Sequence, residues 1–415
     1  MARKNGAGGA DVLLQQVVTH YDENGDIITP GVVKIDQVYG AEDAPALKGW
    51  EAIRRRPGMY IGDVGIRGLH HLFKEIIDNS VDEVLTGNCT AIDVVLGDDY
   101  SITVSDNGRG IPVDIIGDSG KTGVELVFTD IHAGGKLHGD GYKVFGGLHG
   151  IGASAVNALS EWLQCDVKRS GKVHRMRFER GVPMTSLETV GDCDTEGRGT
   201  TVTWLADKTM FHPALTNAGN LAYDGGLIAN RYRELAYLLP AARITFHDRL
   251  YEKPPQTFHF PNGVADYVRD LNWGRDVFPA EPIAIRGTVG ETHIEVALQY
   301  SDADGSAILG FGNMLPTPDD GTHVTGFRRA LTTAVNGISA VRTKHDGKTT
   351  RRGLTAVISV TVHNPYWYGS SKTRLANHEL AGIVFSLVYA RLKNHWAQYP
   401  EQGQGVLKRL MRYTD

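Results

Sequence analysis

The chain of 415 residues contains little cysteine, no long apolar run and no large excess of one charge. Its three cysteines, Cys89, Cys165 and Cys193, are scattered and odd in number, which fits a reduced cytoplasmic compartment and matches no metal-ligand spacing. No segment approaches the roughly 18–20 apolar residues of a membrane span. The basic residues after Met1 precede no apolar segment, so no signal peptide is expected. The sequence therefore predicts a cytoplasmic protein that does not contact membranes.

The net charge of the whole chain is −5, which is small and negative, so it does not indicate that the chain binds nucleic acids. One segment, residues 321–353, departs from this average. Its basic residues are Arg328, Arg329, Arg342, Lys344, Lys348, Arg351 and Arg352, against the single acid Asp346. Such a segment is typical either of a surface that contacts phosphates or of a solvated helix face with a flexible loop, and both alternatives stay open.

The length predicts about two to three domains. We expect an N-terminal tail over residues 1–46, a first domain over 47–250 and a second over 251–415. Within the tail, Asn24-Gly25 lies between two β-branched segments and predicts a hairpin. Further along we expect helices over residues 68–86, 152–163 and 378–396, and strands over 92–96, 101–105, 165–169, 174–179, 200–205, 294–300, 307–313 and 354–362. Strand pairs with short turns and long helices predict an α+β fold, with helices on one face of a mostly antiparallel sheet.

A first group of polar residues lies on the helix predicted over residues 68–86. His71, Glu75, Asn79 and Asp82 occur at positions i, i+4, i+8 and i+11, which places them on one stripe. The other sides are largely apolar and can anchor the helix. The stripe is typical of a solvated face, but it also fits a set of functional groups that faces a cavity.

A second group follows the strand predicted over residues 101–105. Asp106 is placed where the strand ends, and Gly108 and Gly110 allow the backbone to turn and to approach a flat ligand. A carboxylate at this place can accept a hydrogen bond from an exocyclic amine such as that of adenine. The alternative is a tight turn closed by the aspartate side chain.

A third group is rich in glycine, between Gly134 and Gly152. So much glycine is costly to order, which predicts a lid instead of a core element. The lid ends where a helix is expected to begin, and amide groups at a helix N-terminus favour phosphate oxygens. Lys136 and Lys143 add positive charge. A mobile surface loop is the alternative.

The three groups, in this order, resemble the GHKL ATPase superfamily, which gyrase, Hsp90, histidine kinases and MutL share. Five segments look like the gyrase B and topoisomerase IV ATPase subunits, over roughly residues 39 to 400: RPGMYIG (56–62), DNGRGIP (106–112), HAGGK (132–136), GGLHG (146–150) and DDGTHVTGF (319–327). The resemblance implies a GHKL-type α/β sandwich ATPase domain followed by an α+β, ribosomal S5-like transducer domain.

The resemblance assigns roles around the nucleotide. Glu75 is expected to be the general base that activates water, and His71 to support it. Asn79 is expected to offer its carbonyl oxygen to Mg²⁺. Asp106 is expected to bind the adenine amine, together with Thr200.

Other roles concern the phosphates and the edge of the site. Phosphate contacts are expected from Lys136, Lys143, Gly147, Leu148, His149, Gly150 and Gly152, with Tyr142 in the same lid. Gly110 gives the ring room, and Arg109 and Arg169 border the base. Tyr39 matches an arm residue that reaches the partner's nucleotide, and Lys372 matches the transducer lysine that touches the γ-phosphate.

The resemblance also implies ATP as the substrate, a homodimer formed on ATP binding, and the gyrase A subunit and double-stranded DNA as partners in the full enzyme. Aminocoumarin-type inhibitors are expected to bind. Two departures are Phe145, where serine is common, and Ser370, where glutamine is common. A topoisomerase IV subunit and a non-catalytic nucleotide-binding dimerisation module therefore stay open as alternatives.

Overall fold

The computed structural model describes residues 16–21, 27–33, 49–131, 150–217, 219–338, 344–369 and 372–411. The chain forms two compact units, residues 1–48 and 49–415. In the first unit, β1 (Gln16–Tyr21) pairs antiparallel with β2 (Ile27–Val33). The predicted hairpin is therefore confirmed as a strand pair, while its turn lies outside the described residues.

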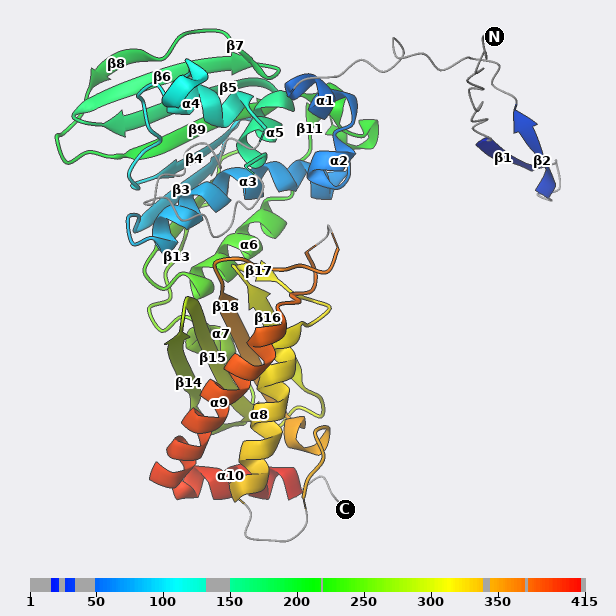
Figure 1. The fold of residues 1–415 in the computed structure, drawn as a ribbon, viewed down its shortest axis with the longest axis vertical. Coiled ribbons are helices and arrows are strands. Elements are labelled where there is room, and N and C mark those ends of the chain that lie inside the picture. Colours follow the sequence, from blue (N-terminus) through cyan, green and yellow to red (C-terminus); the bar gives the residue numbers. More distant parts are fainter. Residues whose placement is uncertain are drawn as a thin grey trace, which may run out of the picture. The chain divides into compact units, whose positions relative to one another are not determined.

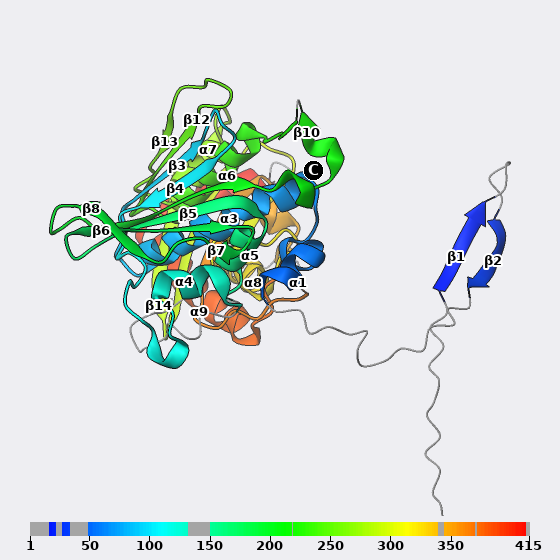
Figure 2. The same cartoon turned by 90° about the horizontal axis from the view of Figure 1, so that it is seen from above.

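The larger sheet of the second unit has nine strands, in the order β13-β12-β3-β4-β9-β5-β6-β7, with β8 beside β6. Only the β12–β3 pair is parallel among these described strands. In Figure 2 the strands of this sheet can be traced from β13 to β8. The strands are β3 (Ala91–Leu96), β4 (Ile102–Asp106), β5 (Ser160–Arg169), β6 (Lys172–Glu179), β7 (Val182–Pro183), β8 (Glu188–Asp192), β9 (Gly199–Ala206), β12 (Arg243–Asp248) and β13 (Gln256–Phe258).

The helices that pack with this sheet are anchored by apolar faces. They are α1 (Trp50–Arg55), α2 (Gly58–Ile61), α3 (Ile66–Leu85), α4 (Gly123–Thr129), α5 (Gly152–Ala158) and α6 (Gly225–Leu238). In α3, the residues predicted to anchor the helix are all buried: Leu72, Phe73, Ile76, Ile77 and Val81. A short pair, β10 (Thr216–Asn217) and β11 (Asn220–Leu221), precedes α6. The predicted α+β arrangement is confirmed.

The two faces of the larger sheet differ in chemistry, because side chains alternate along a strand. On β4, Ile102 and Val104 are buried, whereas Thr103 points to the other face and hydrogen-bonds Thr203 of β9 at 3.0 Å. The same alternation places Asp106 at the end of the apolar face. The polar side chain of Asp106 therefore lies on the inner face of the sheet, which is the face that α3 covers.

The second sheet has five strands in the order β14-β15-β18-β16-β17. These are β14 (Val277–Val289), β15 (Thr292–Ser301), β16 (Ala307–Gly312), β17 (Leu315–Pro316) and β18 (Leu354–Thr361), and every residue of β18 is buried. The helices are α7 (Val264–Leu271), α8 (Thr322–Ile338), α9 (His378–Gln398) and α10 (Pro400–Met411). In Figure 1, α8 and α9 run side by side along this sheet and α10 crosses their far ends.

One predicted element is wrong. The helix expected over residues 152–163 ends at Ala158, and β5 begins at Ser160. Leu163 lies opposite Phe178 of β6 and Trp204 of β9, so it belongs to an interior strand with neighbours on both sides. Burial between two strands outweighs the helical pattern of the preceding residues.

The domain boundary placed at residue 250 stays a prediction, although β13, which lies beyond it, still pairs with the larger sheet. Two apolar clusters form the core: one lies around the larger sheet and extends to Ala297, Phe311 and Val357 of the second sheet, and the other lies between the second sheet and its helices. In the part of the chain that the structure describes, no helix is both long and apolar enough to cross a bilayer. The three cysteines are free thiols, two of them buried.

Candidate active site

One cavity of about 1600 Å³ collects most of the predicted site residues that the structure describes. Its walls come from α2, α3, β4, β9 and the start of α5, and from two segments beside the second sheet: residues 315, 316 and 318, and residues 364–367, 369, 372 and 373. The predicted residues that line it are His71, Glu75, Asn79, Asp106, Gly110, Gly150, Gly152, Thr200 and Lys372. All four residues of the polar stripe on α3, including Asp82, therefore line the cavity.

At one part of the cavity, the Asp106 carboxylate is held by three donors. Ser80 Oγ of α3 donates to Oδ2 at 2.8 Å, and the amides of Gly108 and Thr200 donate to Oδ1 at 2.9 and 3.3 Å. Burial raises the pKa of Asp106, and these hydrogen bonds offset part of the increase. The bond from Gly108 closes the aspartate turn considered as the alternative, and the binding role of Asp106 stays a prediction.

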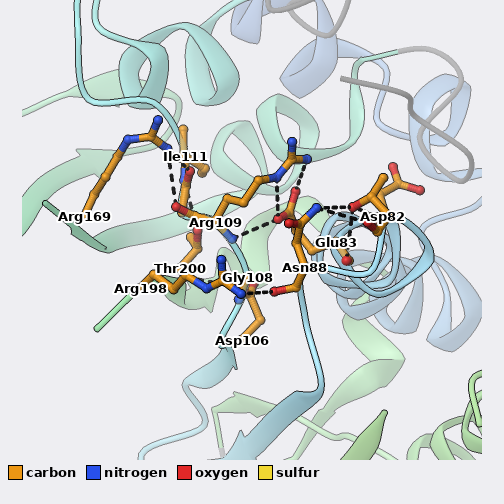
Figure 3. Close-up of polar contacts among 12 residues, drawn as sticks. Asp82, Glu83, Asn88, Asp106, Gly108, Arg109, Ile111, Arg169, Arg198 and Thr200 are labelled. Atoms are coloured by element: carbon orange, nitrogen blue, oxygen red, sulfur yellow. Dashed lines mark hydrogen bonds and ion pairs between the residues drawn. The ribbon is translucent and has the colours of Figure 1, made fainter. Parts of the chain in front are cut away.

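The two arginines predicted to border the base, Arg109 after β4 and Arg169 at the end of β5, are shown with Asp106 in Figure 3. Arg109 is fixed by Glu83, since its Nε and Nη2 donate to the two carboxylate oxygens at 3.0 and 2.8 Å. Arg169 Nη1 donates to the carbonyl of Gly110 at 2.9 Å. Burial favours a higher pKa for Glu83, but hydrogen bonds from Arg109 lower it below the ordinary value. The Arg109 guanidinium is thus held by a bidentate ion pair.

Gly110 has a structural reason to be glycine in addition to room for a ring. Its φ of +75° is in the left-handed region, and an added Cβ would lie 3.0 Å from the carbonyl oxygen of Lys168. The Thr200 hydroxyl accepts a hydrogen bond from the Ile111 amide at 3.3 Å. These contacts hold the loop after β4 against β5 and β9.

The predicted base is tied to its predicted support. His71 Nε2 lies 2.9 Å from Glu75 Oε1, one helical turn apart on α3. Burial favours a higher pKa for Glu75, but the hydrogen bond from His71 and the charges of Lys74 and Lys372 outweigh it and lower the pKa to about 2. Glu75 is therefore ionised at neutral pH, as an acceptor of protons must be.

Two neighbours complete this region. An added Cβ on Gly152, the first residue of α5, would collide with Glu75 Oε2, so the glycine lets the carboxylate lie against the helix start. The Asn79 side chain is exposed to the cavity and has no hydrogen bond to the described residues. Its amide oxygen remains available to a ligand.

Lys372 belongs to the loop that precedes α9, yet it lines the same cavity as Glu75. Its φ of 54° lies in the left-handed region, which is uncommon for a residue with a side chain. Burial and the charge of Lys74 lower its pKa, while Glu75 and Asp78 act in the opposite direction. The lysine is therefore close enough to the predicted base for their charges to interact.

Seven predicted site residues lie outside the described residues, as do Phe145 and Ser370: Tyr39, Lys136, Tyr142, Lys143, Gly147, Leu148 and His149. Their roles stay predictions. Conversely, no sequence pattern indicated Lys74, Ser80, Glu83 or Arg231 as site residues, and all four line the cavity. Charged residues on a helix are most often solvated, so only the packed structure distinguishes them.

The basic segment is partly neutralised within the structure. Arg328 donates to both Asp320 oxygens at 2.6 and 3.1 Å, and Arg329 lies 5.5 Å from the ring centre of Phe385. Lys344 and Lys348 are exposed. The two alternatives for this surface stay open.

The fold and the site define an ATPase of the superfamily described as histidine kinase-, DNA gyrase B- and HSP90-like, whose model matches residues 65–210. A second family model, described as DNA gyrase B, matches residues 263–415. The chain belongs to the DNA gyrase B family.

Curated relatives include the DNA gyrase subunits B of Thermotoga maritima, 43% identical over 389 residues, and Thermus thermophilus, 42% identical over 381 residues. Each match covers 90% of this chain but 59% of the relative, so the chain spans about three fifths of their length.

Two solved structures are similar over nearly their whole length. The 43K ATPase domain of Thermus thermophilus gyrase B in complex with an aminocoumarin has a TM-score of 0.77 and 39% identity, covering 88% of this chain and 94% of that one. The topoisomerase IV ATP-binding domain of Francisella tularensis in complex with a small-molecule inhibitor has a TM-score of 0.73 and 30% identity, covering 88% and 96%. The predicted fold, an ATPase domain with its transducer, is thereby confirmed.

Proposed function

We propose that this chain binds ATP with Mg²⁺, hydrolyses it, and thereby works as a nucleotide-driven dimerisation clamp in a DNA gyrase that passes DNA strands. The observation that carries the proposal is a single cavity that holds an adenine-type acceptor, Asp106, a supported carboxylate, Glu75, and a lysine from the other side, Lys372. In this proposal, Asp106 contacts the adenine, Glu75 acts on the water that attacks the terminal phosphate, and Lys372 balances the charge of the transferred phosphoryl group.

In the proposed reaction, Asp106 accepts a hydrogen bond from the adenine amine and orients the nucleotide. Glu75 accepts a proton from the attacking water while a bond forms between the water oxygen and the terminal phosphorus. The bond to the bridging oxygen breaks, and ADP carries away the negative charge. Positioning and charge neutralisation provide most of the rate increase in such reactions, which is the role proposed for Lys372.

The groups of the cavity fit a magnesium ion. Mg²⁺ prefers oxygen ligands and usually keeps several waters when bound with phosphates. Asn79 offers an amide oxygen without a hydrogen bond to any described residue, and Glu75 lies one turn before it. When bound, the ion would neutralise phosphate charge.

We further propose the partners of the whole enzyme: a second copy of this chain on ATP binding, the gyrase A subunit and double-stranded DNA. An aminocoumarin-type inhibitor would bind beside Arg109 and Arg169, which border the Asp106 region. A cytoplasmic location fits the three free thiols.

A chain that begins at Leu47 should lose the dimerisation that an ATP analogue induces, because the arm with Tyr39 is removed. Light scattering measures this effect. Dimerisation as strong as that of the full chain would contradict an arm exchange.

A topoisomerase IV subunit is the second candidate, because the chain is 30% identical to such an ATP-binding domain. The 39% identity to the gyrase B domain favours gyrase. A non-catalytic binding module is the third. The intact His71–Glu75 pair favours catalysis.

Steady-state ATPase measurements separate a catalytic chain from a non-catalytic binding module. Glu75→Ala should keep nucleotide binding and lose turnover by roughly 10²–10⁴-fold, the usual contribution of a positioned base. A wild-type chain that binds ATP without turning it over would support the binding module. A Glu75→Ala variant as fast as the wild type would show that Glu75 is not the base.

A further inference from the structure

Lys74 stands next to the proposed base on α3 and reaches the same cavity. Its Nζ lies 2.5 Å from Asp78 Oδ2, one helical turn away, and 3.7 Å from Glu75 Oε1. The Asp78 side chain is buried and that of Lys74 is mostly so, at 9% and 26% exposure. This is unlike a surface ion pair, whose two groups are free to separate in water. Asp78 therefore fixes the ammonium group beside Glu75.

The two oxygens of Glu75 have different surroundings. Oε1 is contacted by His71 Nε2 at 2.9 Å and faces the Lys74 ammonium. Oε2 accepts no hydrogen bond from the described residues and lies against Gly152 at the start of α5. His71 and Lys74 thus lie at one oxygen, and the other is left without a hydrogen bond from the described residues, on the side where the predicted phosphate loop ends.

The charges around Glu75 and Lys74 come from three elements. Glu75 is influenced by His71 and Lys74 of α3 and by Lys372 of the loop before α9. Lys74 is in turn influenced by Asp78 of α3 and by Arg231 of α6. Burial by itself lowers the pKa of Lys74, but the charges of Asp78 and Glu75 raise it above the ordinary value. Lys74 is therefore charged at all pH values at which the protein works.

We propose that Lys74 is a positioning residue of the ATPase reaction: clamped by Asp78, it holds the Glu75 carboxylate ionised and turned so that Oε2 receives the proton of the attacking water. The inference rests on the proposed role of Glu75. Lys74 itself need not touch the nucleotide. Removal of its charge should leave nucleotide binding intact, lower the rate of the chemical step, and make Glu75 easier to protonate.

The test compares Lys74→Met and Lys74→Gln, which remove the charge, with Lys74→Arg, which keeps it. We expect the two neutral variants to lower kcat by about 10- to 100-fold, the effect of a displaced catalytic group, with unchanged ADP affinity. The acid limb of their kcat profile should move to higher pH, because a less stabilised carboxylate binds a proton more readily. Lys74→Arg should restore most of the rate and the wild-type pH profile. Lys172→Met, which breaks an exposed ion pair with Asp192 on the β6–β8 edge, is the matched control and should change neither.

A double-mutant cycle with Glu75→Ala separates this inference from the proposed function. If Lys74 acts through Glu75, Lys74→Met should cause no further loss of kcat in the Glu75→Ala background. If Glu75→Ala itself keeps full turnover, the proposed function fails. If only Glu75→Ala is slow and Lys74→Met matches the wild type, the inference alone fails. An equal loss in Lys74→Arg, a parallel loss of ADP affinity, or unfolding of both neutral variants would each overturn it by pointing to a structural or phosphate-binding role.

Discussion

Position 152 requires glycine because the Glu75 side chain lies directly against it. Its backbone is helical, so alanine would be tolerated there by conformation alone, but the added methyl group would meet Glu75 Oε2. We expect Gly152→Ala to turn the carboxylate aside and to lower ATP turnover by about 10- to 100-fold. The amide of residue 152 is retained, so ADP affinity should change little.

Steady-state rates and calorimetric ADP titrations check this prediction. Gly382→Ala in α9 is the control, because an added Cβ there has no atom within 4 Å. An unchanged rate in Gly152→Ala would mean that Glu75 can move without loss, and the proposed geometry of the base would be wrong.

Asp106 tests the binding of the adenine. The carboxylate already accepts hydrogen bonds from three donors, and each of these donors needs an acceptor at position 106. Asp106→Asn turns an amino group towards one of these donors or towards the adenine amine, a mispairing that costs about 1–3 kcal/mol or more. Affinity for a non-hydrolysable ATP analogue should fall at least tenfold, or below detection. Asp118→Asn, on an exposed turn, should bind as the wild type does, and so would Asp106→Asn if another group reads the base.

The residues of the site differ in how far the sequence can predict them. Asp106 and Glu75 are predictable because each has a neighbouring pattern, a strand end with glycines or a polar stripe on a helix. Glu83 has no such pattern, since its contact comes from Arg109, a residue that folding brings close. Lys74 has its partner Asp78 one helical turn away, but its burial beside the cavity follows only from the fold. A charged residue on a helix is predicted to be solvated unless the tertiary structure shows its partner.

At the scale of elements, Asp207 joins α1 to the end of β9. Its side chain is 2% exposed and accepts hydrogen bonds from Arg54 at 2.8 Å and Arg180 at 3.1 Å. Burial favours a higher pKa, but hydrogen bonds from Thr209, Arg54 and Arg180 prevail and lower it from 3.8 to about 2. The folded form thus binds the proton less readily than the unfolded form. The resulting stabilisation, about 2 kcal/mol, is present above pH 4 and is lost as the pH falls towards 2.

We therefore predict that Asp207→Asn lowers the free energy of unfolding at pH 7 by about 3 kcal/mol, because Arg54 loses its buried partner. The variant should also lose part of the acid sensitivity of the wild type below pH 4. Urea unfolding at pH 7, 5 and 3.5 measures both effects. Asp192→Asn, in an exposed ion pair, should change neither. Equal stability of Asp207→Asn and wild type at pH 7 would show that the pair does not hold α1.

Elements also differ in how far the sequence predicts them. The strands β3, β4 and β18 are predicted because their apolar residues alternate or form a short continuous run. In β14 this pattern is interrupted, since prolines at 279 and 282 fall in a segment where the pairing with β15 shifts between Phe278 and Ile283. The end of α5 is mispredicted because the residues after Ala158 are apolar enough for a helix. Their place between β6 and β9 decides the outcome.

At the scale of the whole second unit, the two sheets meet at the cavity. Arg231 of α6 donates to the carbonyl of Met314 beside β17 at 2.8 Å, and it lines the cavity together with residues of the larger sheet. A nucleotide in this place would contact both sheets. Only contacts that differ between ATP and ADP can make the bound nucleotide change their arrangement.

Lys372 is the described residue best placed to make such a contact. It comes from the loop before α9, it lines the cavity, and its charge interacts with those of Lys74, Glu75 and Asp78 near the proposed position of the terminal phosphate. If it contacts that phosphate, it binds ATP but not ADP. We predict that Lys372→Ala lowers turnover at least tenfold and weakens binding of a non-hydrolysable ATP analogue, with ADP affinity unchanged. Calorimetry with both nucleotides and a steady-state ATPase assay measure these effects, and Lys344→Ala, an exposed lysine beside the second sheet, is the control. Equal weakening of ADP and of the ATP analogue would assign Lys372 a general electrostatic role, because a cation that senses the terminal phosphate cannot affect a nucleotide that lacks it.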